Sequence, residues 1–345
     1  MRHEGSHTTV AFLIEKGFED ISFLLPFTAL RQAGVSPLIL SPRRRILYQG
    51  KRGRTSFMSD AAPIEMSPEQ FDALILPGGD APTYLRRNRQ IIRFLQRAMG
   101  AGTLIAAALE GPQVLIESEF LQGRQMTCES SLRTDLRNAG AIYTHLPVVF
   151  EQNILTARST TDLPLFTATL LQALQLTIPG FQLPNPQEHN APWWDIAAAW
   201  GGTSRQELLQ TLQDFYLQER ALLAFCQFHR QHADADVRSF LSFVELSTEH
   251  HCHLLLTHMQ EVERSYVPPT QEQHPEALRP FDRETLLLTL FDLLQARKET
   301  LERMHLTLTD PASGTICDHI EINTSRCEDD LAQLLHSLPE NQFSS

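Results

Sequence analysis

The feature that most constrains the fold is a change in hydrophobic periodicity about halfway along the chain. Residues 8–176 alternate short apolar runs with amphipathic stretches, the pattern of βαβ units on a parallel sheet. From residue 206 onward the strand signals vanish, and apolar residues recur at three- and four-residue spacing. A chain of 345 residues is long for one domain, so the change predicts two domains of different class.

The first half is expected to form a doubly wound parallel α/β sheet over residues 1–178. Its predicted strands cover residues 9–14, 35–40, 71–79, 101–108 and 154–157, and its predicted helices cover residues 19–33, 89–99 and 163–174. The proline within residues 35–40 suggests that this strand begins like an edge strand.

The second half is expected to be an all-α four-helix bundle over residues 201–340. Its predicted helices cover residues 206–231, 236–264, 283–306 and 314–338. Four prolines and three tryptophans mark residues 179–200 as a linker, because proline prevents a continuous helix. We expect the tryptophans to hold the two domains together.

Charge and composition exclude several classes of protein. A net charge of −12 argues against nucleic-acid binding, which needs clustered lysine and arginine. The polar N-terminal residues lack the apolar core of a signal peptide, and no apolar run is long enough to span a membrane. Five cysteines without paired short spacing are typical of reduced thiols, so we predict a cytoplasmic protein.

Residues 101–116 have the pattern of a nucleophile elbow without its nucleophile. A buried strand over residues 101–108 runs directly into a predicted helix that begins near residue 111. Small residues around such a turn allow the backbone to fold sharply and to lift one side chain into a pocket. The lifted residue here is Leu109, which has neither a proton to lose nor a lone pair with which to attack.

The first half resembles the ThiJ/PfpI family, whose doubly wound fold is related to class I glutamine amidotransferases. The matching motifs keep their order along half of the chain, at residues 16–20, 71–79, 110–116, 121–124, 135–141 and 157–164. The resemblance implies a reactive cysteine followed by histidine at the elbow, with an acidic residue beside the thiol. Glu19 supplies the acidic residue, but Leu109 and Glu110 occupy the cysteine and histidine positions.

We therefore interpret the chain as a non-catalytic ThiJ/PfpI-like domain fused to a helical bundle, acting as a ligand-sensing or assembly module. The resemblance implies a homo-oligomer, formed as a dimer through the α/β domain. It also places Ser159 and Thr160 at the pocket. With the turn amides of Gly78 and Gly79 and the amide after Leu109, their hydroxyls are predicted to bind a small polar ligand.

One enzymatic alternative remains open for the α/β domain. Two carboxylates that share a site of low dielectric constant raise the pKa of one of them, which creates an acid/base pair. Glu19 and Glu110 would then act as a hydratase or lyase on a small carbonyl substrate. Cys128 is the alternative nucleophile, but a lone cysteine of this kind is more often a buried structural thiol.

Metal handling by the bundle is the other alternative. The second half resembles ferritin-like bundles, in which inward carboxylates and Glu-x-x-His pairs hold two iron ions. The Glu-x-x-His pairs are missing here, because Cys252 stands three residues after Glu249. The remaining hypothesis is an iron or zinc site built from His250, His253, Glu249 and, in the preceding helix, Glu219.

Overall fold

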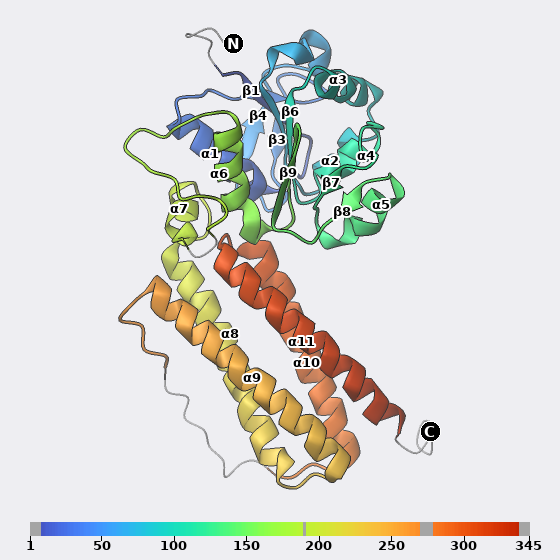
Figure 1. The fold of residues 1–345 in the computed structure, drawn as a ribbon, viewed down its shortest axis with the longest axis vertical. Helices are drawn as coiled ribbons and strands as arrows, with labels where there is room; N and C mark the ends of the chain where they lie inside the picture. Colours follow the sequence, from blue (N-terminus) through green and yellow to red (C-terminus); the bar gives the residue numbers. More distant parts are fainter. Residues whose placement is uncertain (1–7, 189–190, 270–278, 338–345) are drawn as a thin grey trace. The chain divides into compact units, whose positions relative to one another are not determined.

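The computed structural model describes residues 8–188, 191–269 and 279–337, and the chain divides into two compact units (Figure 1). The first unit comprises residues 1–204 with residues 309–311, and the second comprises residues 205–308 with residues 312–345. In the parts that the structure describes, no helix is both long and apolar enough to cross a membrane.

The first unit is built on a six-stranded sheet with the strand order β2-β1-β5-β6-β10-β9. The strands of this sheet are β1 (Val10–Leu13), β2 (Leu38–Leu40), β5 (Ala73–Leu76), β6 (Leu104–Ala108), β9 (Val148–Glu151) and β10 (Ile154–Ala157). All neighbours pair in parallel except β9 and β10. The predicted doubly wound, mainly parallel sheet is therefore confirmed.

Helices cover both faces of this sheet, as Figure 1 shows. Side chains of β1 alternate between the faces: Val10 and Phe12 enter one hydrophobic core, and Ala11 and Leu13 enter the other. The first core is completed by α1 (Asp20–Gln32), α6 (Leu163–Ala173) and α7 (Trp193–Ala199), and the second by α3 (Arg89–Gly100), α4 (Pro112–Ile116) and α5 (Arg133–Asn138). The short helix α2 (Ala81–Leu85) follows β5.

Several strands of the first unit were not predicted, although residues 123–127, which contain β7, have a strand-like pattern. The edge strand β9 runs antiparallel to β10, so the sheet does not end at residues 154–157. An antiparallel hairpin forms from β3 (Leu47–Gln49) and β4 (Ser56–Met58), and a parallel pair forms from β7 (Gln125–Met126) and β8 (Ile142–Tyr143). These strands have two to four residues, too few for a clear alternating pattern in the sequence.

The expected linker contains a helix that packs into the first unit. Within residues 179–200, α7 places Trp193, Ile196 and Trp200 in the same core as α1 and α6. Trp193 and Trp200 are almost completely buried there, and the Trp200 indole N–H donates to Gln32 Oε1 at 3.2 Å. Trp193 and Trp200, which we expected to join two domains, thus complete the core of the α/β unit.

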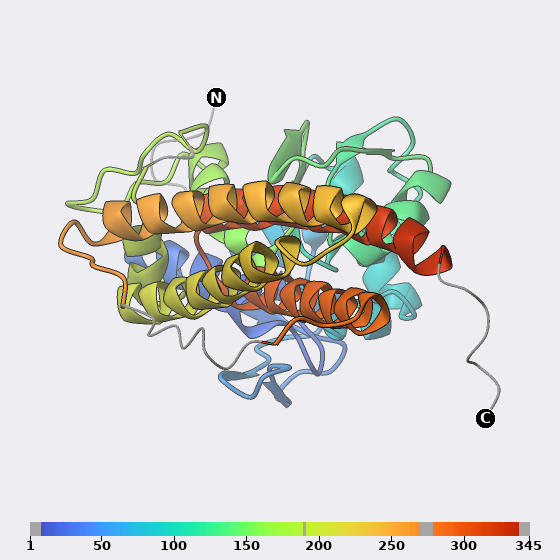
Figure 2. The same ribbon diagram turned by 90° about the horizontal axis from the view of Figure 1, so that it is seen from below.

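The described part of the second unit consists of four long helices that lie side by side (Figure 2). They are α8 (Arg205–Arg230), α9 (Ala235–Val262), α10 (Arg283–Thr307) and α11 (Pro311–His336). The predicted helices agree with these bounds to within three residues at each end, because each helix carries an apolar stripe at helical spacing.

The two described ends of the segment between α9 and α10 lie near opposite ends of α8. At its start, the Tyr266 hydroxyl donates to Gln213, near the beginning of α8. At its end, the Phe281 ring lies 4.7 Å from the His229 ring, near the end of α8. Helices α9 and α10 therefore run in the same direction, which is the topology of a bundle with one long crossover.

The packing of α7 predicts the effect of removing one side chain from it. Ile196→Ala is expected to lower the free energy of unfolding of the first unit by about 2–5 kcal/mol, the usual loss for a buried isoleucine. Tryptophan fluorescence in urea measures this, since all three tryptophans lie in the first unit. Ile64→Ala, at a side chain that is 71% exposed, is the control. Equal midpoints for the two variants would contradict the assignment of α7 to this core.

Candidate functional site

The sharp turn of the elbow is present. Strand β6 ends at Ala108, Leu109 has a φ of +57°, and α4 begins at Pro112. The left-handed conformation costs a residue such as leucine about 1–2 kcal/mol. Two backbone hydrogen bonds hold it in place, from the Leu109 N–H to Ala157 O at 3.0 Å and from the Glu129 N–H to Leu109 O at 3.1 Å.

The side chain of Leu109 fills the place to which the elbow points. It is 3% exposed and belongs to the core that α1 and α6 cover. Gly78 faces it closely, because a Cβ on Gly78 would lie 2.8 Å from Leu109 Cβ and 2.4 Å from Glu110 Oε2. Only glycine leaves room for this contact, so the turn after β5 and the elbow fit directly against each other.

The carboxylate of Glu110 binds the backbone of the same turn. The Gly79 N–H donates to Glu110 Oε2 at 2.8 Å. Burial raises the pKa of the Glu110 carboxyl above its usual value, and this hydrogen bond opposes the rise. The Gly78 N–H donates to Ser22 Oγ at 3.1 Å. Two of the three amides that we expected to bind a ligand, those of Gly78 and Gly79, therefore bind side chains of the protein.

Glu19 caps helix α1 and contacts a basic loop. Its Oε2 accepts a hydrogen bond from the Ser22 N–H at 2.6 Å, and its Oε1 lies 3.6 Å from Arg52 Nε. The Glu19 N–H also donates to Gly78 O at 2.8 Å. The structure thus brings both candidate acid/base residues, Glu19 and Glu110, to the Gly78–Gly79 turn, where each supports the backbone.

The next residue, Asp20, was missed by the sequence analysis. It is 1% exposed and accepts hydrogen bonds at 2.8 Å from the Arg52 N–H, the Thr55 N–H and the Thr55 hydroxyl. These bonds hold the loop that carries Arg52 against Glu19. A charged residue directly after the expected start of the helix is the signal that could have indicated this role.

Ser159 and Thr160 lie after β10, as the resemblance implied, but the Ser159 hydroxyl is used within the protein. It contacts Asp162 Oδ2 and Thr161 Oγ1, both at 2.7 Å. The Thr160 hydroxyl is buried and has no hydrogen-bond partner among the residues that the structure describes. Of these two predicted site residues, only Thr160 therefore has a hydroxyl oxygen without a hydrogen bond in the described parts of the chain.

Cys128 lies buried in the core formed by α3, α4 and α5. Burial raises the pKa of its thiol to about 12, and the negative charge of Glu129 adds to the rise. The reactive form of cysteine is the thiolate, which this environment disfavours. Its surroundings are those of a structural thiol.

A buried ion pair occupies the centre of the second unit. Glu219 of α8 and Arg297 of α10 are each at most 1% exposed. The guanidinium binds the carboxylate with two hydrogen bonds, from Nε to Oε1 at 2.8 Å and from Nη2 to Oε2 at 2.9 Å. Arg297 Nη2 also donates to Thr248 Oγ1 of α9 at 2.9 Å. Bidentate hydrogen bonds between arginine and a carboxylate are stronger than hydrogen bonds between neutral groups.

Helix α11 extends this network through His251 of α9. His251 Nδ1 lies 3.0 Å from Glu219 Oε2, and His251 Nε2 lies 3.0 Å from Asn323 Nδ2. Because an amide nitrogen only donates, we assign the ring proton to Nδ1, which donates to Glu219. Burial lowers the pKa of His251, which agrees with a neutral ring. All four helices thus contribute to one polar network.

These residues do not fit a metal ion at Glu219. Both carboxylate oxygens already bind Arg297, so a cation would have to displace the guanidinium. The other hypothesised ligands, Glu249, His250 and His253, are exposed on α9 and do not join the buried Glu219. Arg297 was not predicted as the partner of Glu219. Its position interrupts the apolar stripe of α10, and a charged residue at such a position needs a buried partner.

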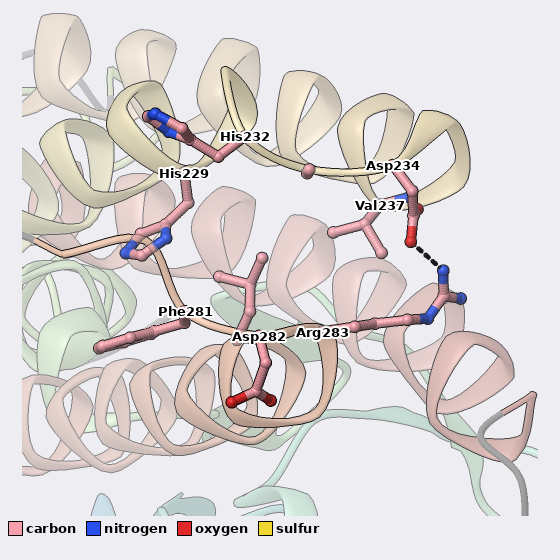
Figure 3. Close-up of a pocket in the computed structure, with 9 residues that line it drawn as sticks. His229, His232, Asp234, Val237, Phe281, Asp282 and Arg283 are labelled. Atoms are coloured by element: carbon pink, nitrogen blue, oxygen red, sulfur yellow. Dashed lines mark hydrogen bonds and ion pairs between the residues drawn. The ribbon is translucent and has the colours of Figure 1, made fainter.

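A separate cavity of about 310 Å³ lies at one end of the bundle (Figure 3). His229, Val237, Phe281 and Leu286 line it, and an ion pair between Asp234 and Arg283 stands beside them. The His229 ring is buried, and Nε2 has no hydrogen-bond partner in the described parts of the chain. Burial also lowers the pKa of His229. The cavity therefore offers a neutral ring nitrogen next to an aromatic wall.

The ion pair at the bundle centre predicts a strong dependence on both partners. Arg297→Met should lower the free energy of unfolding by about 3–5 kcal/mol, because it leaves the Glu219 carboxylate buried without its partner. The double variant Glu219→Leu/Arg297→Met should recover most of that loss. Urea unfolding followed by circular dichroism measures both, with Arg303→Met on the exposed face of α10 as control. A double variant as unstable as the sum of the single variants would contradict coupling of the pair.

Comparison with known proteins agrees with this architecture. The model of the DJ-1/PfpI family matches residues 8–173. Protein/nucleic acid deglycase 2 of Escherichia coli (strain K12) is 34% identical over 166 residues, which cover 48% of this chain and 96% of that protein. General stress protein 18 of Bacillus subtilis (strain 168) is 30% identical over 167 residues, which cover 48% of this chain and 97% of that protein.

One solved structure extends the similarity to both units. It is a two-domain protein from Anabaena variabilis ATCC 29413 that contains DJ-1/ThiJ/PfpI-like and ferritin-like domains. It is 31% identical, covers 96% of each chain and has a TM-score of 0.90. The two resemblances inferred from the sequence are thereby confirmed. This chain belongs to the DJ-1/PfpI family, and a ferritin-like helical domain is fused to its family domain.

Proposed function

We propose that the α/β domain is a non-catalytic member of its family that serves as a binding or assembly module for the fused helical domain. The observation that carries this proposal is Leu109, which stands at the elbow with its apolar side chain packed into the core. A leucine cannot form the covalent intermediates that a thiol or hydroxyl forms.

The polar groups around the elbow support the same conclusion. Glu110 binds Gly79, Glu19 caps α1, and Ser22 binds Gly78. The contacts of Glu110 and Ser22 stabilise the turn between β5 and α2, and the contact of Glu19 stabilises the start of α1. The domain thus keeps the scaffold of an active site while its side chains serve the fold.

Exposed apolar side chains on the β3–β4 hairpin support assembly. Leu47 and Met58 are paired directly across the hairpin and are 62% and 56% exposed. Exposed apolar side chains that stand together are typical of protein–protein contact sites. We propose that this hairpin contributes to a homodimer of the α/β domain. A cytoplasmic location, which the five free and buried cysteines support, remains part of the proposal.

Catalysis by Glu110 is the second candidate function. Several relatives are named deglycases, among them the Escherichia coli protein. The raised pKa of the half-buried Glu110 carboxyl is also a property of catalytic acids. On this alternative the protein would act on a small carbonyl compound without using a cysteine thiol of its own. Glu110→Gln would then abolish the turnover.

Restoring the nucleophile tests the proposal directly. Wild-type protein should show no deglycase activity above background, in an assay that uses the Escherichia coli relative named a deglycase as the positive control. Leu109→Cys should gain a thiol that maleimide labels faster than the five buried wild-type cysteines, because cysteine is smaller than leucine and opens space where the elbow points. The double variant Leu109→Cys/Glu110→His restores both residues that the family resemblance implies.

Leu115→Cys is the matched control, because it places a thiol at another fully buried leucine just beyond the elbow. Wild-type turnover comparable to that of the relative would overturn the non-catalytic proposal. If that turnover disappears in Glu110→Gln, the carboxylate mechanism takes its place.

Sedimentation velocity tests the proposed assembly. Wild-type protein is expected to sediment as a dimer, and Leu47→Lys/Met58→Lys as a monomer, because two charges would be buried in the interface. Ile322→Lys, at a side chain of the helical domain that is 71% exposed, should leave the dimer intact. A double variant that remains dimeric would exclude this hairpin from the interface.

A further inference from the structure

A cluster of metal-ligating side chains lies where α10 turns into α11. His305 is in the last turn of α10, and Asp318 and Glu321 lie three residues apart in the first half of α11. Side chains at this spacing project from the same face of a helix. Only residues 308–310 connect the two helices, so α11 folds back and brings that face against His305.

The distances within this cluster suit ligands of one metal ion. Among the described residues, His305, Asp318 and Glu321 each offer a donor atom within 4.8 Å of the others. His305 Nε2 lies 3.5 Å from Asp318 Oδ1 and 3.9 Å from Glu321 Oε2. An N–H···O hydrogen bond spans about 2.7–3.2 Å. Donor atoms about 2.0–2.1 Å from a tetrahedral zinc ion stand roughly 3.4 Å apart.

The environment of His305 also leaves its Nε2 atom able to bind a metal ion. Its Nε2 atom is shielded from solvent and has no hydrogen-bond partner within the described ranges of the chain. A ring nitrogen that is shielded from water and has no partner has lost its hydration without compensation. Glu321, by contrast, is 48% exposed, so the cluster is open to solvent on one side. An ion that enters from that side would contact all three donor atoms.

We propose that His305, Asp318 and Glu321 bind one divalent transition-metal ion of the zinc type. The two carboxylates balance its charge, and the imidazole nitrogen favours such an ion over magnesium or calcium, which prefer oxygen ligands. Water completes the coordination on the exposed side. This site is separate from the bundle centre, where the Arg297 guanidinium supplies the positive charge beside Glu219.

Metal titration of the full chain tests the proposal. After treatment with a chelator, wild-type protein is expected to bind Zn²⁺ in a calorimetric titration and to give a Co²⁺ absorption band in the visible range. His305→Ala, Asp318→Asn and Glu321→Gln should each weaken the binding at this site by at least about tenfold, a loss that even an outer-shell substitution can cause. Each should also remove the Co²⁺ band.

Exposed donors on α9 provide the controls. His253→Ala and Glu249→Gln remove side chains of the same types from the surface and should leave the affinity and the band unchanged. Because Glu321 is half-exposed, Glu321→Gln tests the site without removing a core contact. Wild-type protein that binds no Zn²⁺, or His305→Ala protein that binds it as tightly as the wild type, would overturn the proposal and leave the cluster as an ion pair.

Discussion

A carboxylate that is taken out of water must find a partner inside the protein, and this requirement organises both units. In the α/β unit, Glu110 binds the Gly79 amide, so the turn after β5 is held against the elbow. In the helical unit, Glu219 binds Arg297, and this pair joins α8 to α10 at the centre of the bundle. Desolvation makes each carboxylate costly without its partner, so each contact holds together the segments that carry the two groups.

At both sites, polar side chains that could face a ligand bind other groups of the protein. The elbow keeps its left-handed residue and its close contact with Gly78, although a leucine now occupies the turn. The bundle has an inward glutamate, Glu219, whose carboxylate binds the Arg297 guanidinium. In both places the contacts join segments of the protein and stabilise its fold.

The sequence predicted the elements whose pattern is long and regular. The buried strand before Leu109 and the four helices of the bundle follow directly from hydrophobic periodicity. The edge strand β9 and helix α7 are too short to give such a signal. The site residues were harder to predict, because their partners are distant in the sequence. Glu219 was recognised as facing inward, but Arg297 lies 78 residues away and only the packed helices bring the two together.

The direction of the helices has a consequence for how the second unit can fold. Helices α8 and α9 form one antiparallel hairpin, α10 and α11 form another, and only the crossover over residues 263–282 joins them. Each hairpin has a short connection and gains its contacts locally, whereas contacts between the hairpins must close a longer loop. The bond between Glu219 and Arg297 links one hairpin to the other. This ion pair therefore fixes the register in which the α8–α9 hairpin packs against the α10–α11 hairpin.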